Sequence, residues 1–358
     1  MAAAGVIADF ELPPELEAGE PPEARGLRRD EVRLLVSDVA RDTIEHARFR
    51  DLPRWLAAGD LLVVNTSATL NAALAAASER GAFEIHLSTR LPGGFWTVEV
   101  RRPNGNWSEP YRQARAGERY VLPAGGTATL LAPYPLGASF EAQSRLWLAA
   151  VHVPADIVTY LQRHGAPIRY RYAKRAWPGP MYQTAFAIEP GSAEMPSAAR
   201  PFTPELVTAL VSRGVQVAPL LLHTGVASLE AHEPPYEEFY RVPAATAQAV
   251  NSARRAGRRV VAVGTTVVRA LETVTDQDGT TFPGEGWTDR VITADGAVRS
   301  VNALITGLHE PRATHLAMLA AVAGNRSHLE RAYEEARRTG YLWHEFGDSH
   351  LILAPGRR

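Results

Sequence analysis

A short apolar strand that ends at a glycine and runs directly into a helix restricts the fold of this chain most. Residues 260–263 read Val-Val-Ala-Val, a β-branched and small apolar run that is typical of a strand buried on both faces. Gly264 lets the backbone turn, and either Thr265 or Thr266 can cap the helix that the following apolar spacing predicts. The pattern indicates an α/β protein.

The first turn of this predicted helix is a candidate ligand site. Its free N–H groups favour a carboxylate or a phosphate, and Arg269, one turn further along, can reinforce such an anion site. The alternative is an ordinary capped helix with Arg269 in a surface ion pair, because many helices with this pattern bind nothing.

The remaining patterns predict an α/β domain that a β domain interrupts. In residues 72–151, short alternating runs are separated by turn sequences rich in Pro, Gly and Asn, which indicates an inserted antiparallel β-barrel. Residues 1–71 and 152–358 are assigned to the α/β main domain. Strands are predicted at residues 31–37, 43–49, 60–65, 83–89, 95–101, 120–122, 127–131, 146–151, 215–222 and 260–263, and helical segments at 52–58, 154–163, 204–213, 243–255 and 314–322.

Composition favours an enzyme of two or three domains that works in the cytoplasm. With 358 residues, of which 46% are hydrophobic, the chain can bury a substantial core. It contains no cysteine, which excludes disulfides and thiolate metal sites, and no apolar stretch approaches the roughly 20 residues that cross a bilayer. We expect no contact with a membrane and a monomer or weak homo-oligomer.

A basic and aromatic segment is the candidate nucleic-acid interface. The formal net charge is −1, so an RNA partner requires a local concentration of cations. Such side chains can neutralise phosphates and stack on unpaired bases. An ordinary solvated surface segment is the alternative. The residues concerned are Arg169, Arg171, Tyr172, Lys174 and Arg175.

Several motifs in the same order along the chain carry a resemblance to one family. The segment from Gly264 to Arg269 resembles the Gly-Thr-Thr-x-x-Arg of the S-adenosylmethionine:tRNA ribosyltransferase-isomerases (QueA), which act in queuosine biosynthesis. The other matching segments, which together span nearly the whole chain, are residues 9–16 (Asp-Phe-Glu-Leu-Pro-Pro-Glu-Leu), 59–65 (Gly-Asp-Leu-Leu-Val-Val-Asn), 182–184 (Tyr-Gln-Thr), 222–225 (Leu-His-Thr-Gly) and 346–348 (Phe-Gly-Asp).

The chain also departs from the family pattern. Two family arginines are replaced by Ala68 and Ala73, and a family histidine is replaced by Pro201, which can neither ligate a metal nor transfer a proton. The segment from residue 307 to 314 keeps a histidine and a proline and gains a charge pair. These changes favour a divergent member of the family.

The resemblance implies a reaction and a barrel-like mixed sheet, flanked by helices, in the main domain. The ribosyl part of S-adenosylmethionine is transferred to a 7-aminomethyl-7-deazaguanine in tRNA and isomerised to an epoxide, with release of adenine and methionine. This chemistry needs a positioned base, a proton for adenine and a clamp for the methionine carboxylate, and it needs no metal.

The candidate residues follow from these needs. His309 is the leading acid or base because a histidine titrates near neutral pH and Glu310 can orient it or raise its pKa. His223 should emerge at a strand end, where α/β proteins place ligands, although a core histidine is the alternative. Asp348 and Glu238 are weaker candidates for contacts to the adenine, ribose or amine of S-adenosylmethionine, since carboxylates in loops are more often turn caps. Gly264, Thr265, Thr266 and Arg269 are expected to contact S-adenosylmethionine.

Three readings remain open. A metal site at His344, Glu345 and His350 is weakly indicated, because a third ligand at defined spacing is missing. The enzyme can use tRNA as its acceptor, or apply the same chemistry to a small molecule or another nucleic acid. A non-catalytic nucleoside-binding or RNA-binding relative is the alternative from a different class.

Overall fold

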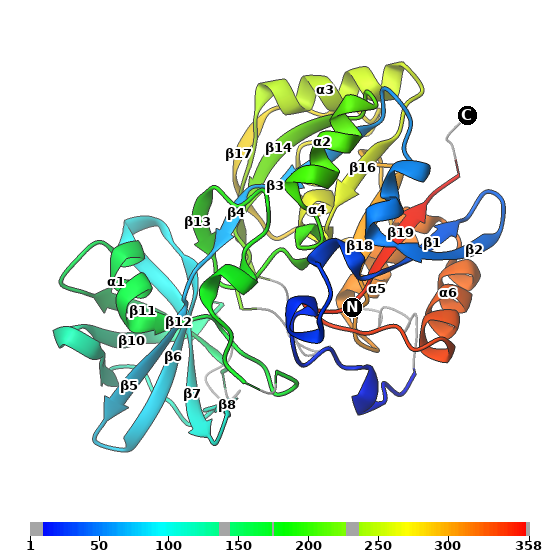
Figure 1. The fold of residues 1–358 in the computed structure, drawn as a ribbon. Helices are drawn as coiled ribbons and strands as arrows, with labels where there is room; N and C mark the ends of the chain where they lie inside the picture. Colours follow the sequence, from blue (N-terminus) through cyan, green and yellow to red (C-terminus); the bar gives the residue numbers. More distant parts are fainter. Residues whose placement is uncertain (1–9, 136–143, 174, 227–235, 356–358) are drawn as a thin grey trace.

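The computed structural model describes residues 10–135, 144–173, 175–226 and 236–355, and its largest element is a mixed nine-stranded sheet (Figure 1). The four neighbouring strands β14, β3, β16 and β18 run parallel. In spatial order the strands are β17 (Gly284–Thr288), β15 (Glu238–Val242), β14 (Gln216–Leu222), β3 (Leu61–Asn65), β16 (Val260–Val263), β18 (Ala303–Gly307), β19 (Ser349–Leu353), β1 (Arg33–Asp38) and β2 (Thr43–Arg48).

Helices cover both faces of this sheet, because its central strands are apolar on both sides. Leu61 and Val63 face one hydrophobic core, whereas Leu62 and Val64 face the other. The first core includes residues of α3 (Ala244–Arg255), α4 (Thr265–Thr273), α5 (Thr314–Ala323) and α6 (Arg326–Arg338). The second includes residues of α2 (Pro204–Ser212) and of the 3₁₀ turns η4 (Phe49–Arg54) and η8 (Ser197–Ala199).

A closed antiparallel barrel forms the second body of the molecule, which confirms the expected all-β barrel. Six strands form the ring because β11 pairs with both β10 and β7. They are β5 (Ala73–Ser78), β6 (Gly81–Arg90), β7 (Phe95–Asn104), β9 (Arg119–Val121), β10 (Thr127–Tyr134) and β11 (Leu146–His152). The strands β8 (Trp107–Pro110) and β12 (Gly165–Ala166) extend it, and α1 (Ile157–His164) packs Tyr160 and Leu161 into its core.

A small parallel sheet of β4 (Ser67–Thr69) and β13 (Glu189–Ser192) lies between the two bodies (Figure 1). It directly continues β3 and therefore connects the main sheet to the barrel. The remaining short turns are η1 (Pro14–Leu16), η2 (Pro22–Arg25), η3 (Arg29–Glu31), η5 (Pro92–Gly94), η6 (Pro123–Gly125) and η7 (Gly179–Tyr182). None of the described helices is long and apolar enough to cross a membrane.

Three expectations about this architecture are wrong. The main sheet is open rather than barrel-like, because no pairing joins its edge strands β17 and β2 in the described part of the chain. The helix predicted at Pro154 begins at Ile157 instead, with the Asp156 side chain accepting hydrogen bonds from two backbone amides of its first turn. Neither Thr265 nor Thr266 caps α4, since Gly264 occupies the N-cap position and no side chain bonds there.

Candidate functional site

The carboxyl ends of four adjacent parallel strands bring most of the predicted site residues to one edge of the main sheet. His223 follows β14, Asn65 ends β3, Gly264 follows β16, and His309 lies two residues beyond β18. Because parallel strands end at the same side of a sheet, these residues come from distant parts of the sequence to a common edge. We call this region the carboxyl edge.

The side chain of Asn65 links the carboxyl ends of β3 and β14 by hydrogen bonds. Its Nδ2 donates to the carbonyl of Leu222 at 2.8 Å, and its Oδ1 accepts from the Leu222 amide at 3.0 Å and from the Ser67 amide at 3.1 Å. Asn65 is fully buried, so these bonds satisfy both ends of an amide that water does not reach. The residue after Leu222, His223, is thereby held at a fixed place.

The imidazole of His223 rests against the small sheet. Its Nδ1 lies 2.7 Å from Ser67 Oγ, and Ser67 Oγ lies 2.6 Å from Ser192 Oγ. The ring also packs on the backbone at Gly191, where a Cβ would approach within 2.3 Å of it. Burial lowers the pKa of His223, so the ring is neutral at pH 7.

The turn at Gly264 has the geometry that favours glycine. Its φ is 100° and ψ 152°, and its amide donates to the Ile305 carbonyl at 2.8 Å. In the described residues, the amides of Thr265 and Thr266 have no acceptor, as is usual in the first turn of a helix. Gly264 and Thr265 are buried, whereas Thr266 is partly exposed.

Arg269 and Glu238 form an ion pair beside this turn. The Arg269 guanidinium donates to the Glu238 carboxylate, which also accepts from the Gly225 amide at 2.9 Å, and to the Thr288 carbonyl at 3.3 Å. The exposed fractions of the two side chains are 18% and 11%, so the pair is largely shielded from water. The structure thus brings together two residues that the sequence proposed for the same ligand.

His309 lies in a cluster of neutral aromatic groups. Its Nε2 is 2.8 Å from Thr306 Oγ1, its carbonyl accepts from the Trp343 indole at 3.0 Å, and its ring stacks on His315 with centroids 4.6 Å apart. Burial, followed by the neighbouring His315 and His350, holds the pKa of His309 well below its usual value. At neutral pH this histidine accepts a proton rather than donates one.

The expected partnership between Glu310 and His309 is wrong. Glu310 is exposed, and its carboxylate lies 3.4 Å from His344 Nδ1. Although 51% of its side chain is exposed, desolvation by the surrounding protein, followed by the nearby Glu17, raises the pKa of Glu310. Thr306, rather than a carboxylate, fixes the His309 ring, and the pKa of His309 is lowered instead of raised.

Asp348 is placed as a loop cap. Its carboxylate accepts from the amides of Arg33 at 2.7 Å and Leu342 at 2.8 Å, and it is 5% exposed. These bonds tie the loop before β19 to the start of β1. The role of a turn cap, which the sequence offered as the alternative for Asp348, therefore accounts for its contacts.

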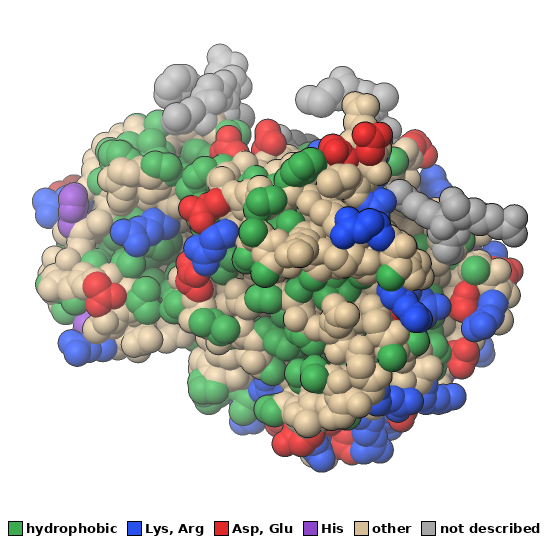
Figure 2. Space-filling view, turned by 90° about the horizontal axis from the view of Figure 1, so that it is seen from above, with side chains coloured by type: hydrophobic (Ala, Val, Ile, Leu, Met, Phe, Trp, Pro, Cys, Tyr) green, Lys and Arg blue, Asp and Glu red, His purple; other side chains and the backbone are tan. Residues whose placement is uncertain are grey.

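The basic and aromatic segment is only partly available for nucleic acid. Tyr172 stacks on His344 with centroids 3.8 Å apart and donates to Glu345. Arg171 and Arg175 are exposed, Arg169 is partly exposed, and Lys174 lies outside the described residues. On the face above α3, basic side chains are scattered among acidic ones (Figure 2).

The residues weighed as metal ligands have other roles. His350 is buried and lies 2.8 Å from Ser37 Oγ, whereas Glu345 accepts from Tyr172 and His344 lies near Glu310. In the described ranges no group of three or more His, Cys, Asp or Glu side chains is arranged to hold a metal ion.

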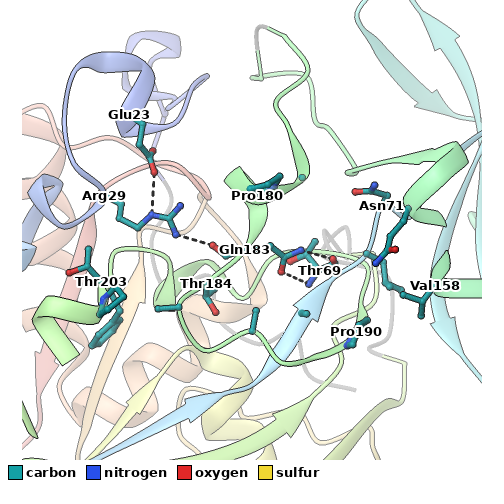
Figure 3. Close-up of a pocket in the computed structure, with 18 of the residues that line it drawn as sticks. Glu23, Arg29, Thr69, Asn71, Val158, Pro180, Gln183, Thr184, Pro190 and Thr203 are labelled. Carbon is teal, nitrogen blue, oxygen red and sulfur yellow. Dashed lines mark hydrogen bonds and ion pairs between the residues drawn. The ribbon is translucent and has the colours of Figure 1, made fainter. Parts of the chain in front are cut away.

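A cavity of about 1040 Å³ lies next to the small sheet (Figure 3). One wall carries a fixed network, in which Arg29 pairs with Glu23 and donates to the Gln183 carbonyl, and the Gln183 side chain exchanges two hydrogen bonds with the Thr69 backbone. Ala68, Asn71 and Pro190 also line the cavity.

The cavity and the carboxyl edge share the small sheet but not their lining. Ala68 and Pro190 line the cavity, while Ser67 and Ser192 of the same two strands bond to each other next to His223. None of Gly264, Thr265, Thr266 and Arg269 lines this cavity. Sequence reasoning missed Asn65, Ser67, Ser192 and Asn71 as site residues; polar side chains directly after a buried strand were the available signal for the first two.

Comparisons with known proteins agree with one another. The family described as queuosine biosynthesis protein matches residues 8–352. The chain is similar to the S-adenosylmethionine:tRNA ribosyltransferase-isomerases of Symbiobacterium thermophilum and Thermus thermophilus, with 38% identity to each over 96% of this chain and 98% of theirs. Among solved structures, the crystal structure of S-adenosylmethionine tRNA ribosyltransferase from Thermotoga maritima is 32% identical, with a TM-score of 0.53 over 97% of this chain and 100% of that chain.

Proposed function

This chain belongs to the family of queuosine biosynthesis proteins, and from that premise we propose that it is a ribosyltransferase-isomerase. It transfers the ribosyl part of S-adenosylmethionine to a 7-aminomethyl-7-deazaguanine base in tRNA, isomerises it to the epoxide, and releases adenine and methionine. The convergence of His223, Gly264 and His309 at the carboxyl edge is the observation that supports this activity best.

The first turn of α4 and the adjacent ion pair suit the methionine part of S-adenosylmethionine. The amides of Thr265 and Thr266 offer donors to its carboxylate, and the helix end adds a partial positive charge. Arg269 and Glu238 present opposite charges side by side, which complements an α-carboxylate and an α-ammonium. In this arrangement the turn at Gly264 binds the methionine carboxylate, and the ion pair orients the amino-acid end of S-adenosylmethionine.

His309 then serves as the base. Its lowered pKa keeps it neutral, and Thr306 fixes the orientation of its ring. A neutral imidazole can take the C5' proton that the sulfonium makes acidic.

We place the acceptor base in the cavity, with its aminomethyl group directed toward the carboxyl edge, where the ribosyl group must meet it. A base must leave its stack to be modified, and a cavity of about 1040 Å³ is at the large end of the usual range for ligand sites. The side-chain amide of Asn71 points to this space in Figure 3 and has no hydrogen-bond partner in the described residues. It offers both a donor and an acceptor to a base edge.

We also propose the domain division given by the sequence, with residues 72–151 inserted into a main domain of residues 1–71 and 152–358. The strand pairings support it, because β5 to β11 close on themselves while β1 to β3 and β14 to β19 share the large sheet. The helix α1 and the strand β12, which follow this insertion, also pack on the barrel.

Product analysis tests the function. Purified chain is incubated with S-adenosylmethionine and tRNA that carries the precursor base, and adenine and methionine are quantified. We expect release that requires this tRNA and is absent with the same tRNA lacking the base. His309→Ala should abolish release while the exposed control His152→Ala retains it. Wild-type turnover by the His309 variant would remove this residue from the mechanism.

One feature favours an acceptor other than tRNA. Ala68, which stands where the family pattern has an arginine, lines the cavity and offers no positive charge to a phosphate. Release of adenine with the free precursor base, but not with tRNA, would establish that variant. Tight binding of S-adenosylmethionine without any turnover would identify a non-catalytic relative.

A further inference from the structure

A chain of hydrogen bonds leads from the backbone of Thr224 to the imidazole of His223. The Thr224 amide donates to Ser192 Oγ at 3.0 Å, Ser192 Oγ lies 2.6 Å from Ser67 Oγ, and Ser67 Oγ lies 2.7 Å from His223 Nδ1. Both serines are fully buried, with exposed fractions of 0%. We call these two side chains the serine relay.

The direction of the relay follows from counting protons. Each hydroxyl has one proton to donate, and an amide can only donate. In the described residues, the only acceptor in reach of the Ser192 proton is Ser67 Oγ, and the Ser67 proton then points to His223 Nδ1. The opposite direction would put a proton on Nδ1 and leave the buried Ser192 hydroxyl without an acceptor, which costs free energy.

We propose that Ser67 and Ser192 are positioning residues that hold His223 as a neutral imidazole with its proton on Nε2, presented to a lone pair of the substrate. Nε2 has no hydrogen-bond partner in the described residues, and the nearest charged atom, Glu189 Oε1, is 4.0 Å away. The side chain of His223 is 18% exposed, so a ligand can reach it.

The groups that face His223 agree with a neutral ring. Glu189 favours a positive charge on the ring, but Arg241 pairs with the same carboxylate and opposes it. Phe239 stacks on the other side with centroids 5.9 Å apart. Protonation of Nδ1 would also require both serine hydroxyls to turn away, so the relay resists it.

This tautomer defines what His223 does. A neutral imidazole does not release its Nε2 proton near pH 7, and therefore His223 donates a hydrogen bond without transferring the proton. The acceptor class that fits is an aromatic nitrogen lone pair, which in the reaction is a ring nitrogen of the departing adenine. The assignment of adenine rests on the proposed function, whereas the tautomer does not.

Nitrogen NMR of the whole chain with ¹⁵N-labelled histidine tests the tautomer without any turnover. His223 is assigned by comparison with His223→Gln. We expect the wild-type ring to show a protonated Nε2 and an unprotonated Nδ1 from pH 7 to pH 8. In Ser67→Ala the apparent pKa of His223 should rise by about one unit, because the donor that opposes Nδ1 protonation is gone.

Ser88→Ala is the matched control, since Ser88 is equally buried and its hydroxyl accepts a hydrogen bond from the Val226 amide.

Two results would overturn the proposal: a proton on Nδ1 in the wild type, or a Ser67→Ala spectrum and pKa that match the wild type. Ser67→Cys provides a second variant in case Ser67→Ala does not fold: the thiol is a weaker donor of similar size, so the pKa of His223 should rise there as well. In kinetics, the acidic limb of kcat/KM should move to higher pH in Ser67→Ala and stay unchanged in Ser88→Ala. A chain with the expected spectra but no adenine release would retain the relay and refute the proposed function instead.

Discussion

At the scale of single residues, the pair of Arg269 and Glu238 places opposite charges where little water reaches them. Removing one partner leaves the other charge shielded and unpaired, which costs more than losing an exposed pair. We predict that Arg269→Ala lowers the free energy of unfolding by roughly 3 kcal/mol. Urea denaturation monitored by fluorescence measures this change. Adding Glu238→Gln to Arg269→Ala should recover part of it, because the remaining carboxylate is neutralised.

The matched control is the exposed ion pair of Arg326 and Glu330 on α6, whose side chains are 52% and 43% exposed. Arg326→Ala should change the free energy of unfolding by no more than about 0.5 kcal/mol. Equal losses in the two arginine variants would contradict the shielding of Arg269.

The sequence predicted which residues lie at the site better than it predicted their contacts. The motif around Gly264 and the position of His223 after an apolar strand both pointed to the carboxyl edge, where the structure places them. The partners of His223 were out of reach, because Ser67 and Ser192 are separated by 125 positions and neither carries a motif. The prediction for Glu310 failed for the opposite reason. Glu310 is adjacent to His309 in the sequence, but its carboxylate points away from that ring and lies beside His344.

At the scale of elements, the small sheet of β4 and β13 depends on Gly191 to admit the His223 ring. A Cβ at this position would lie 2.3 to 2.5 Å from three imidazole atoms, and Ser67 restrains that ring from moving aside. We predict that Gly191→Ala displaces His223, lowers the free energy of unfolding by roughly 1 to 3 kcal/mol and strongly reduces adenine release. Denaturation and product assays measure the two effects.

Gly307 at the end of β18 is the control for this substitution. It lies at the same carboxyl edge, but a Cβ there would meet nothing within 4 Å. Gly307→Ala should therefore keep its stability within about 0.5 kcal/mol of the wild type. A Gly191 variant as stable and active as the Gly307 variant would show that the His223 ring moves freely.

The elements that the sequence predicted correctly are those with strong local signals. β16 and β3 are short apolar runs, and α2 begins at Pro204 with Thr203 as its N-cap. The missed elements include β5, β15, β17, β18, β19 and α6. The α6 signal was present, since Leu329, Ala332, Tyr333 and Ala336 are buried at helical spacing, but its polar composition obscured it. Openness of the main sheet depends on long-range pairing, which no local pattern encodes.

At the scale of the whole molecule, the two bodies meet through segments that also carry the chemistry. The small sheet continues β3, holds His223 through its serines and lines the cavity through Ala68 and Pro190. A shift of the barrel relative to the main sheet would therefore reach both proposed substrate sites. The small sheet therefore contributes to both proposed sites, whereas Gly264 and His309 lie on the main sheet alone.

Neutral histidines in the folded molecule also determine how it responds to acid. Burial lowers the pKa of His315 and His344 to about 4 and that of His350 to about 3, and the pKa of His309 lies well below its usual value. In the unfolded chain these imidazoles titrate near pH 6.5. Their contribution to stability is therefore complete above pH 6.5 and is lost as the pH falls toward 4, because the unfolded state binds more protons.

We predict that the free energy of unfolding falls as the pH is lowered from 7 to 5, and that His315→Gln falls less steeply. Below pH 6.5 each such histidine contributes up to about 1.4 kcal/mol per pH unit. Buried carboxyl groups act in the opposite sense, since burial raises the pKa of Asp348 and Glu345, but that contribution is the same in both proteins and cancels in their difference. Urea denaturation at pH 5, 6, 7 and 8 measures the two curves, with the difference at pH 8 as the baseline. Parallel curves would mean that His315 is solvated in the folded state and that the stacked histidines at the carboxyl edge are open to protons.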